Sequence, residues 1–175
     1  EDLKSNFDIT EKLKKIDCII HLAALAHNKY KKNEIFEVNV NSVIRLAKQA
    51  SQAKVKKFIF LSTIKVYGEF SPNNTIFNEE SPTFPQTIYA KAKLDAEKYL
   101  LDLSKISDLK ITIIRSPLVY GKNAKSNLKK LYFFIENKIP IPRINQLNFR
   151  SFIAIDNLTD FISTCIHSNH SSNKI

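Results

Sequence analysis

The chain has 175 residues, of which 43% are hydrophobic and 25% are charged, and its formal net charge is +10. This composition is typical of a globular fold with room for one core, or for one core and part of another. No apolar stretch approaches the roughly 20 residues of a membrane helix, and the polar start lacks the apolar segment of a signal peptide.

The lysines are scattered and form no long basic run, so we expect no nucleic-acid partner. The positive field is instead suited to attracting an anionic nucleotide ligand. Cys18 and Cys165 lie inside apolar runs and make no metal-binding spacing. We therefore expect buried thiols and a reducing, cytoplasmic environment.

Short apolar runs alternate along the chain with amphipathic segments. In chain order, we expect a strand over 18–24, a helix over 33–53, a strand over 57–62, a helix from Tyr89 to about Lys105, a strand over 110–115, a helix over 127–137, a strand over 150–155 and a helix with Asp156 as its N-cap. Such alternation with nearly continuous apolar strands predicts an α/β fold, a parallel sheet covered by helices on both faces. Its ligand site is expected beyond the carboxyl ends of the strands.

Tyr89 and Lys93 are four residues apart on one expected helix and therefore share a face. They follow Ser62 and Thr63, which end an apolar strand. A tyrosine loses its proton near pH 10 and is a poor base at neutrality, but a lysine charge held close lowers the phenol pKa. This arrangement suits proton transfer with a sugar or alcohol hydroxyl during hydride transfer. A half-buried tyrosine and a solvated lysine are the alternatives.

The chain has two glycines, Gly68 and Gly121, and each follows Val-Tyr. The phosphate loop of a dinucleotide-binding fold needs several glycines for its tight turn. Either the chain binds no dinucleotide, or it is a piece of a longer protein whose first strand, loop and helix are not included. The polar start and the absence of any methionine favour the second interpretation.

Five motifs, in order and at matching spacing, resemble the extended short-chain dehydrogenase/reductase family in its nucleotide-sugar epimerase/dehydratase branch. They lie at 17–24, 39–42, 62–68, 89–97 and 115–121, and the segment 150–158 is a further similarity. The resemblance covers nearly the whole chain. It is strongest to UDP-glucose 4-epimerase-like enzymes of bacterial surface-polysaccharide synthesis, which act on N-acetylated nucleotide sugars.

The resemblance implies a Rossmann-like doubly wound parallel sheet without its N-terminal phosphate-binding unit. Residues 1–120 would form the NAD-binding domain lacking its first portion, and residues 121–175 a partial substrate-binding region that returns to the sheet. A further C-terminal portion would be missing as well. We expect NAD as cofactor, with NADP open, a nucleotide-diphosphate sugar as substrate, a homodimer for the full-length protein, and no activity of the fragment alone.

By the same resemblance, the catalytic residues are Tyr89 as general acid/base, Lys93, which would also bind the nicotinamide ribose, and Thr63, which would orient the substrate oxygen. Ser62 competes with Thr63, because neighbouring strand residues face opposite sides. The implied cofactor-binding residues are Leu22, Ala23, Ala24, Asn39, Ser62, Tyr89, Lys93 and Pro117. The implied substrate-binding residues are Thr63, Asn127, Leu128 and Arg150, the last suited to a diphosphate by its forked donors.

Structural alternatives stand beside these roles: core packing for residues 22–24, a helix-surface position for Asn39, and a surface ion pair for Arg150. His21 and His27 have no third ligand near them in sequence, so we interpret them as structural and expect no metal.

The function expected from the resemblance is a 4-epimerase that works through a 4-keto sugar. An NAD(P)H-dependent 4-keto reductase with the same triad is one alternative, and an inactive fragment or non-catalytic binding module is another. A dehydratase is disfavoured, because dehydratases of this family carry an Asp-Glu pair directly after the serine/threonine position, where this chain has Ile64 and Lys65.

Overall fold

The computed structural model describes residues 8–26, 30–71, 76–121, 128–140, 150–168 and 171–175, and the side chains of 128–131 are not described. In chain order the elements are α1 (Thr10–Leu13), β1 (Cys18–His21), α2 (Lys32–Phe36), the π-helical η1 (Glu37–Asn41), α3 (Ser42–Gln52), β2 (Lys57–Thr63), the 3₁₀ turn η2 (Ile64–Tyr67), α4 (Ile88–Ile106), β3 (Lys110–Ser116), β4 (Leu118–Tyr120), α5 (Leu128–Glu136), β5 (Phe152–Ala154) and α6 (Ile155–His167).

The centre of the fold is a parallel sheet with strand order β1-β2-β3. In its register His21 lies beside Phe60, and Thr63 lies beside Ser116. The C-terminal segment adds to the outer edge of β3, where the Ile113 amide donates to the Lys174 carbonyl at 2.9 Å. The expected α/β fold with a parallel sheet is confirmed.

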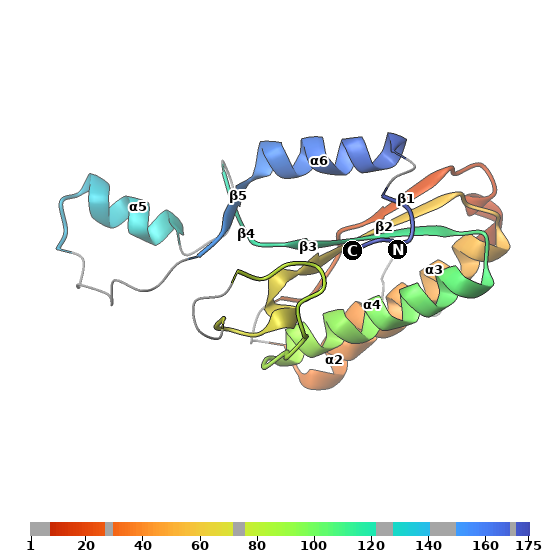
Figure 1. The fold of residues 1–175 in the computed structure, drawn as a ribbon, viewed down its shortest axis with the longest axis horizontal. Coiled ribbons are helices and arrows are strands. Elements are labelled where there is room, and N and C mark those ends of the chain that lie inside the picture. Colours follow the sequence, from red (N-terminus) through yellow and green to blue (C-terminus); the bar gives the residue numbers. More distant parts are fainter. Residues whose placement is uncertain (1–7, 27–29, 72–75, 122–127, 141–149, 169–170) are drawn as a thin grey trace.

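Helices cover both faces of this sheet, α3 and α4 on one side and α6 on the other (Figure 1). Along β2 the side chains alternate, so that Phe58 and Phe60 pack toward α3 and α4 while Ile59 packs toward α6. All three are fully buried. Because β2 is apolar on both faces, it forms the centre of the core.

The end of α6 is held by a charged side chain from the sheet. Lys57, at the start of β2, is buried, and its ammonium donates to the carbonyls of Cys165 at 2.8 Å, Ile166 at 3.0 Å and Ser168 at 2.7 Å. The last carbonyls of a helix have no partners within the helix and carry its negative dipole end. A buried ammonium satisfies both needs.

Some local details differ from the sequence-based expectation. The helix expected over 33–53 is interrupted by the π-helical η1. The first strand ends at His21 rather than at Ala24. The N-cap of α6 is Ala154, without a side-chain hydrogen bond, and Asp156 lies in the first turn instead, where its carboxylate still favours the helix dipole.

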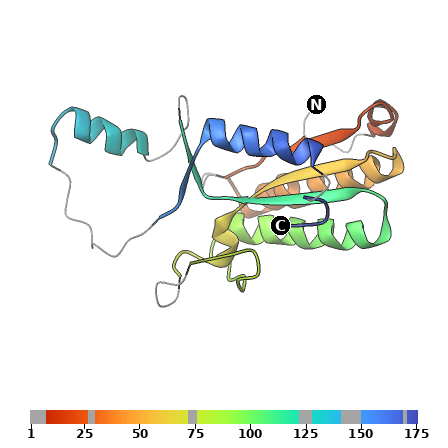
Figure 2. The same ribbon diagram turned by 45° about the horizontal axis from the view of Figure 1, so that its top comes forward.

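The short parallel pair β4–β5 leads away from the main sheet, and α5 lies apart from it (Figures 1 and 2). Tyr132, Phe133 and Ile135 of α5 are exposed. Among the described residues, no helix is long and apolar enough to cross a membrane.

Candidate active site

A groove with a volume of about 1260 Å³ lies at the carboxyl ends of β2 and β3. It is lined by residues from segments that are far apart in sequence, among them Thr63, Tyr89, Pro117 and Arg150. This is the edge of a parallel sheet at which a ligand site is expected. The fold therefore brings four of the predicted site residues to one cavity.

Tyr89 lies in the first turn of α4 and is half-buried. The helix start is fixed by Thr87, whose hydroxyl accepts a hydrogen bond from the Ala90 amide at 3.1 Å. Burial raises the pKa of Tyr89 above its ordinary value. The lowered pKa that the sequence led us to expect is not found in this structure, because burial disfavours the phenolate.

Lys93 lies one turn after Tyr89, and its side chain reaches the end of strand β2. Only 1% of the residue is exposed, and its ammonium donates to the Leu61 carbonyl at 2.8 Å and lies 4.3 Å from the centroid of the Phe60 ring. Burial lowers the pKa of Lys93 to about 8, against the opposing effect of the Glu97 carboxylate. The alternative of a solvated surface lysine is thus wrong.

Thr63 and Ser62 end β2 with their side chains in different environments. Thr63 lines the groove, and its hydroxyl oxygen accepts from the Lys65 amide at 3.3 Å, which leaves the hydroxyl proton available to a ligand. The Ser62 hydroxyl is buried and donates to the Glu97 carboxylate. A cofactor contact of Ser62 stays a prediction.

A buried ion pair lies beneath the groove and was missed by the sequence reasoning. The Arg115 guanidinium meets the Glu97 carboxylate at 2.7 Å, with side chains only 8% and 1% exposed. Arg115 also donates to the Tyr67 hydroxyl at 2.8 Å. The available signal was the position of Glu97 four residues after Lys93, on the same face of α4. The pair ties α4 to β3 at the level of the site.

The segment that follows β1 begins with exposed residues, and an asparagine side chain binds its backbone at Leu25. Leu22 is 54% exposed and Ala23 is exposed too, so core packing does not explain these residues. Asn39, in the π-helical turn η1, is fully buried; its side-chain oxygen accepts from the Leu25 amide at 2.8 Å and its side-chain nitrogen donates to the Leu25 carbonyl at 3.0 Å. The helix-surface alternative for Asn39 is therefore wrong, and cofactor contacts of residues 22–24 stay predictions.

The remaining predicted substrate residues are placed only in part. Arg150 is exposed at the groove, and no ion pair of it occurs within the described part of the chain. Leu128 is the first residue of α5, but its side chain is not described, and Asn127 lies outside the described residues. Substrate contacts of all three stay predictions.

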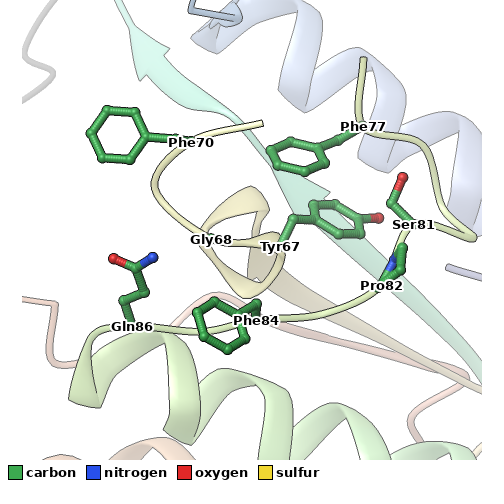
Figure 3. Close-up of a pocket in the computed structure, with 8 residues that line it drawn as sticks. All are labelled: Tyr67, Gly68, Phe70, Phe77, Ser81, Pro82, Phe84 and Gln86. Atoms are coloured by element: carbon green, nitrogen blue, oxygen red, sulfur yellow. The ribbon is translucent and has the colours of Figure 1, made fainter. Parts of the chain in front are cut away.

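An aromatic pocket of about 280 Å³ adjoins the groove and shares Tyr67, Gly68, Phe70 and Phe77 with it (Figure 3). Tyr67 and Phe77 stack with their ring centroids 5.1 Å apart. The remaining wall is formed by Ser81, Pro82, Phe84 and Gln86. This lining suits a small group that is mostly apolar, such as an acyl group or one face of a sugar ring.

Comparison with known proteins agrees with this geometry. A profile described as "NAD dependent epimerase/dehydratase family" matches residues 2–174. The chain belongs to this family. Among curated relatives, the UDP-glucose 4-epimerase of Vibrio cholerae is 37% identical over 181 residues, which cover 99% of this chain and 55% of that protein. Human dTDP-D-glucose 4,6-dehydratase is 36% identical over 110 residues, or 61% of this chain and 31% of that protein.

Solved structures show the same fold. The UDP-glucuronic acid 4-epimerase of Bacillus cereus, in complex with UDP-glucuronic acid and NAD, superposes with a TM-score of 0.81 at 25% identity, covering 98% of this chain and 55% of that chain. A short-chain dehydrogenase/reductase superfamily protein from Agrobacterium tumefaciens with bound NAD gives 0.79 at 17% identity, covering 97% and 62%. The chain thus spans little more than half the length of these relatives.

Proposed function

We propose that this chain carries the acid/base residues of an NAD-dependent nucleotide-sugar 4-epimerase, and that its substrate is a UDP-N-acetylhexosamine. The observation that supports this best is that Thr63 and Tyr89 line one groove while Lys93 lies one helical turn from Tyr89. NAD, when bound, would take the hydride from C4 of the sugar and return it to the opposite face.

In the proposed mechanism, Tyr89 takes the proton of the C4 hydroxyl and later gives it back, while Thr63 orients that oxygen. Tyr89 can act as a base only if its pKa falls from the raised value of this structure. In this mechanism the charge that lowers it is the Lys93 ammonium, which is desolvated and would therefore act strongly on a phenol brought close to it. We propose that ligand binding brings the Tyr89 phenol toward this charge.

The residues at the sheet edge fit a dinucleotide. Leu22 and Ala23 are exposed where β1 ends, and Pro117 follows β3 at the groove. A flat, partly apolar ligand can pack closely on an exposed leucine that is followed by a small residue at a strand end. Asn39 would hold this segment in place through its two bonds to Leu25.

The substrate class is inferred from the surroundings of Tyr89. Arg150 offers a forked cationic donor group to a diphosphate. The aromatic pocket beside the groove would receive the apolar acyl substituent of the sugar. The pocket shares four residues with the groove that Thr63 and Tyr89 line, so a sugar bound in the groove could extend its substituent into the pocket.

The positions after Thr63 support epimerisation rather than dehydration. Lys65 forms an ion pair with Glu69 at 3.2 Å, and Ile64 packs against the cluster of Val66, Tyr67 and Leu94. Neither position carries the carboxyl group of the Asp-Glu pair that dehydratases of this family have there. A 4-keto reductase would use the same three residues. The two activities differ in that a reductase consumes one NADH per turnover, whereas an epimerase consumes none.

The test uses the full-length protein that contains this chain, incubated with UDP-N-acetylglucosamine and NAD. We expect inversion at C4 without net formation or consumption of NADH. Tyr89→Phe should lower kcat by at least about 100-fold, because general acid/base catalysis contributes about that much. The matched control is Tyr99→Phe on the same helix, which should retain activity. Stoichiometric NADH consumption on a 4-keto sugar, or full activity of Tyr89→Phe, would contradict the proposal.

A further inference from the structure

His21 is a buried histidine to which neither the fold nor the proposed mechanism assigns a partner. It is the last residue of β1 and is 4% exposed. Its ring lies against two rings of β2, with centroids 6.2 Å from Phe58 and 5.8 Å from Phe60. Both imidazole nitrogens are buried, and neither has a hydrogen-bond partner among the residues that the structure describes. Since buried polar groups are nearly always bonded, these nitrogens point to a function.

The nearest charged group to consider is the Lys93 ammonium, which lies against the same Phe60 ring as the imidazole. An ammonium has three N–H donors. One donates to the Leu61 carbonyl, and a second can face the negative surface of the Phe60 ring. The third has no acceptor among the described residues, and an unprotonated imidazole is an acceptor of the kind it lacks.

We propose that His21 is a positioning residue for Lys93, whose ammonium donates to an imidazole nitrogen of His21 through one ordered water molecule. The link rests on the proposed catalytic role of Lys93. With Leu61 and Phe60, His21 would hold the ammonium at three points beneath the groove. Lys93 would then present its charge to Tyr89 from one defined place.

The electrostatics of the pair agree with this arrangement. Burial and the neighbouring Lys93 ammonium lower the pKa of His21 to about 4, so the imidazole stays an acceptor at neutral pH. The other charged group acting on Lys93 is Glu97 of α4, while β2 faces the pair with Phe58 and Phe60. The pair therefore carries a single positive charge, which avoids the cost of two buried cations.

The test is NMR of the isotopically labelled 175-residue chain, which requires no turnover. The Lys93 side-chain signal is identified by its loss in Lys93→Met, and the His21 signal by its loss in His21→Phe. His21→Phe keeps a ring but removes the acceptor, so the pKa of Lys93 should fall below about 8. His21→Gln, which restores an acceptor, should return it toward the original value.

A second readout remains interpretable if His21→Phe fails to fold. In Lys93→Met the pKa of His21 should rise above about 4, and the nitrogen signal of a hydrogen-bonded imidazole should change to that of an unbonded one. An unchanged Lys93 pKa in His21→Phe, or a His21 nitrogen signal indifferent to Lys93→Met, would overturn the proposal. Because neither readout measures epimerisation, the proposed function can fail or hold independently of this result.

Discussion

At the scale of single residues, three buried polar or charged side chains contact β2 close to the groove. His21, Lys93 and Glu97 are each at most 4% exposed, and they lie on β1 and α4 directly behind the carboxyl edge of β2. Burial makes each interaction stronger and each missing partner more costly. The first two predictions follow from this.

His21 should make stability depend on pH. Its pKa is lowered from 6.5 to about 4 in the folded chain, so the unfolded chain binds its proton first as the pH falls. Its contribution to the free energy of unfolding is therefore present above about pH 6.5 and is lost toward pH 4, a change of up to about 3 kcal/mol. Urea unfolding at both pH values should show a smaller loss for His21→Phe than for the wild type.

Glu97→Gln should destabilise the fold by about 3 kcal/mol or more, because it leaves the buried Arg115 guanidinium without its carboxylate. The matched control on the same helix is Asp102→Asn, which breaks an exposed pair with Lys105 and should cost at most about 1 kcal/mol. Denaturant unfolding at pH 7 measures both. Equal effects of the two variants would show that burial of the Glu97 pair does not matter.

At the scale of elements, the hydrogen bonds that attach the end of α6 to the sheet come from one lysine at the start of β2. The Lys57 ammonium binds three carbonyls at the end of α6, whose apolar side packs through Leu158 and Ile162 on the sheet. Among the described residues this is the one cation seen to join a strand to a helix C-terminus. It makes the position of α6 sensitive to a single side chain.

Lys57→Met should loosen α6 while leaving the other face of the sheet intact. We expect a loss of about 2 kcal/mol, since hydrogen bonds to a charged donor are replaced by unpaired carbonyls. Hydrogen exchange should become faster in the last turns of α6 and remain slow in α4. The neighbouring Lys56, exposed and paired with Asp17, provides the control as Lys56→Met. Slow exchange throughout α6 in Lys57→Met would contradict this role.

At the scale of the whole molecule, a ligand of two nucleotides must be held at its phosphates as well as at its reacting end. Gly68 follows η2 and Gly121 follows β4, and neither lies in a short turn that joins a strand directly to a sheet-covering helix. A glycine-rich turn at that kind of position is what binds a pyrophosphate in this fold. Under the proposed function, the 175 residues would carry the reacting end of the site, and their sequence contains no glycine-rich phosphate loop.

We expect the 175-residue chain to bind NAD weakly, without saturation up to about 1 mM, because the reacting end alone supplies few contacts. Isothermal titration calorimetry measures this directly. The full-length protein, titrated in parallel, should bind far more tightly. Micromolar binding by the chain alone would mean that its phosphate contacts come from residues other than a glycine-rich loop.

Much of this architecture could be predicted from local sequence. The apolar runs of β2 and β3 and the position of the helix with Tyr89 and Lys93 follow from periodicity, because strand and helix repeats act over a few residues. The π-helical turn around Asn39 could not be predicted, since its amide is satisfied by Leu25, fourteen residues away. Nor could the N-cap of α6, where packing against the sheet outweighed the preference of Asp156.

The sequence by itself determined the kind of chemistry available: a tyrosine and a lysine on one helix face, a threonine at a strand end, and the motifs of an epimerase/dehydratase family. Only the tertiary structure decided how these groups are poised. It turned Thr63 to the groove and Ser62 to Glu97, buried Lys93 against Phe60, and left the pKa of Tyr89 raised. The physical reason is that residue spacing sets which side chains share a face, whereas their charges and pKa values depend on neighbours that only the folded chain brings together.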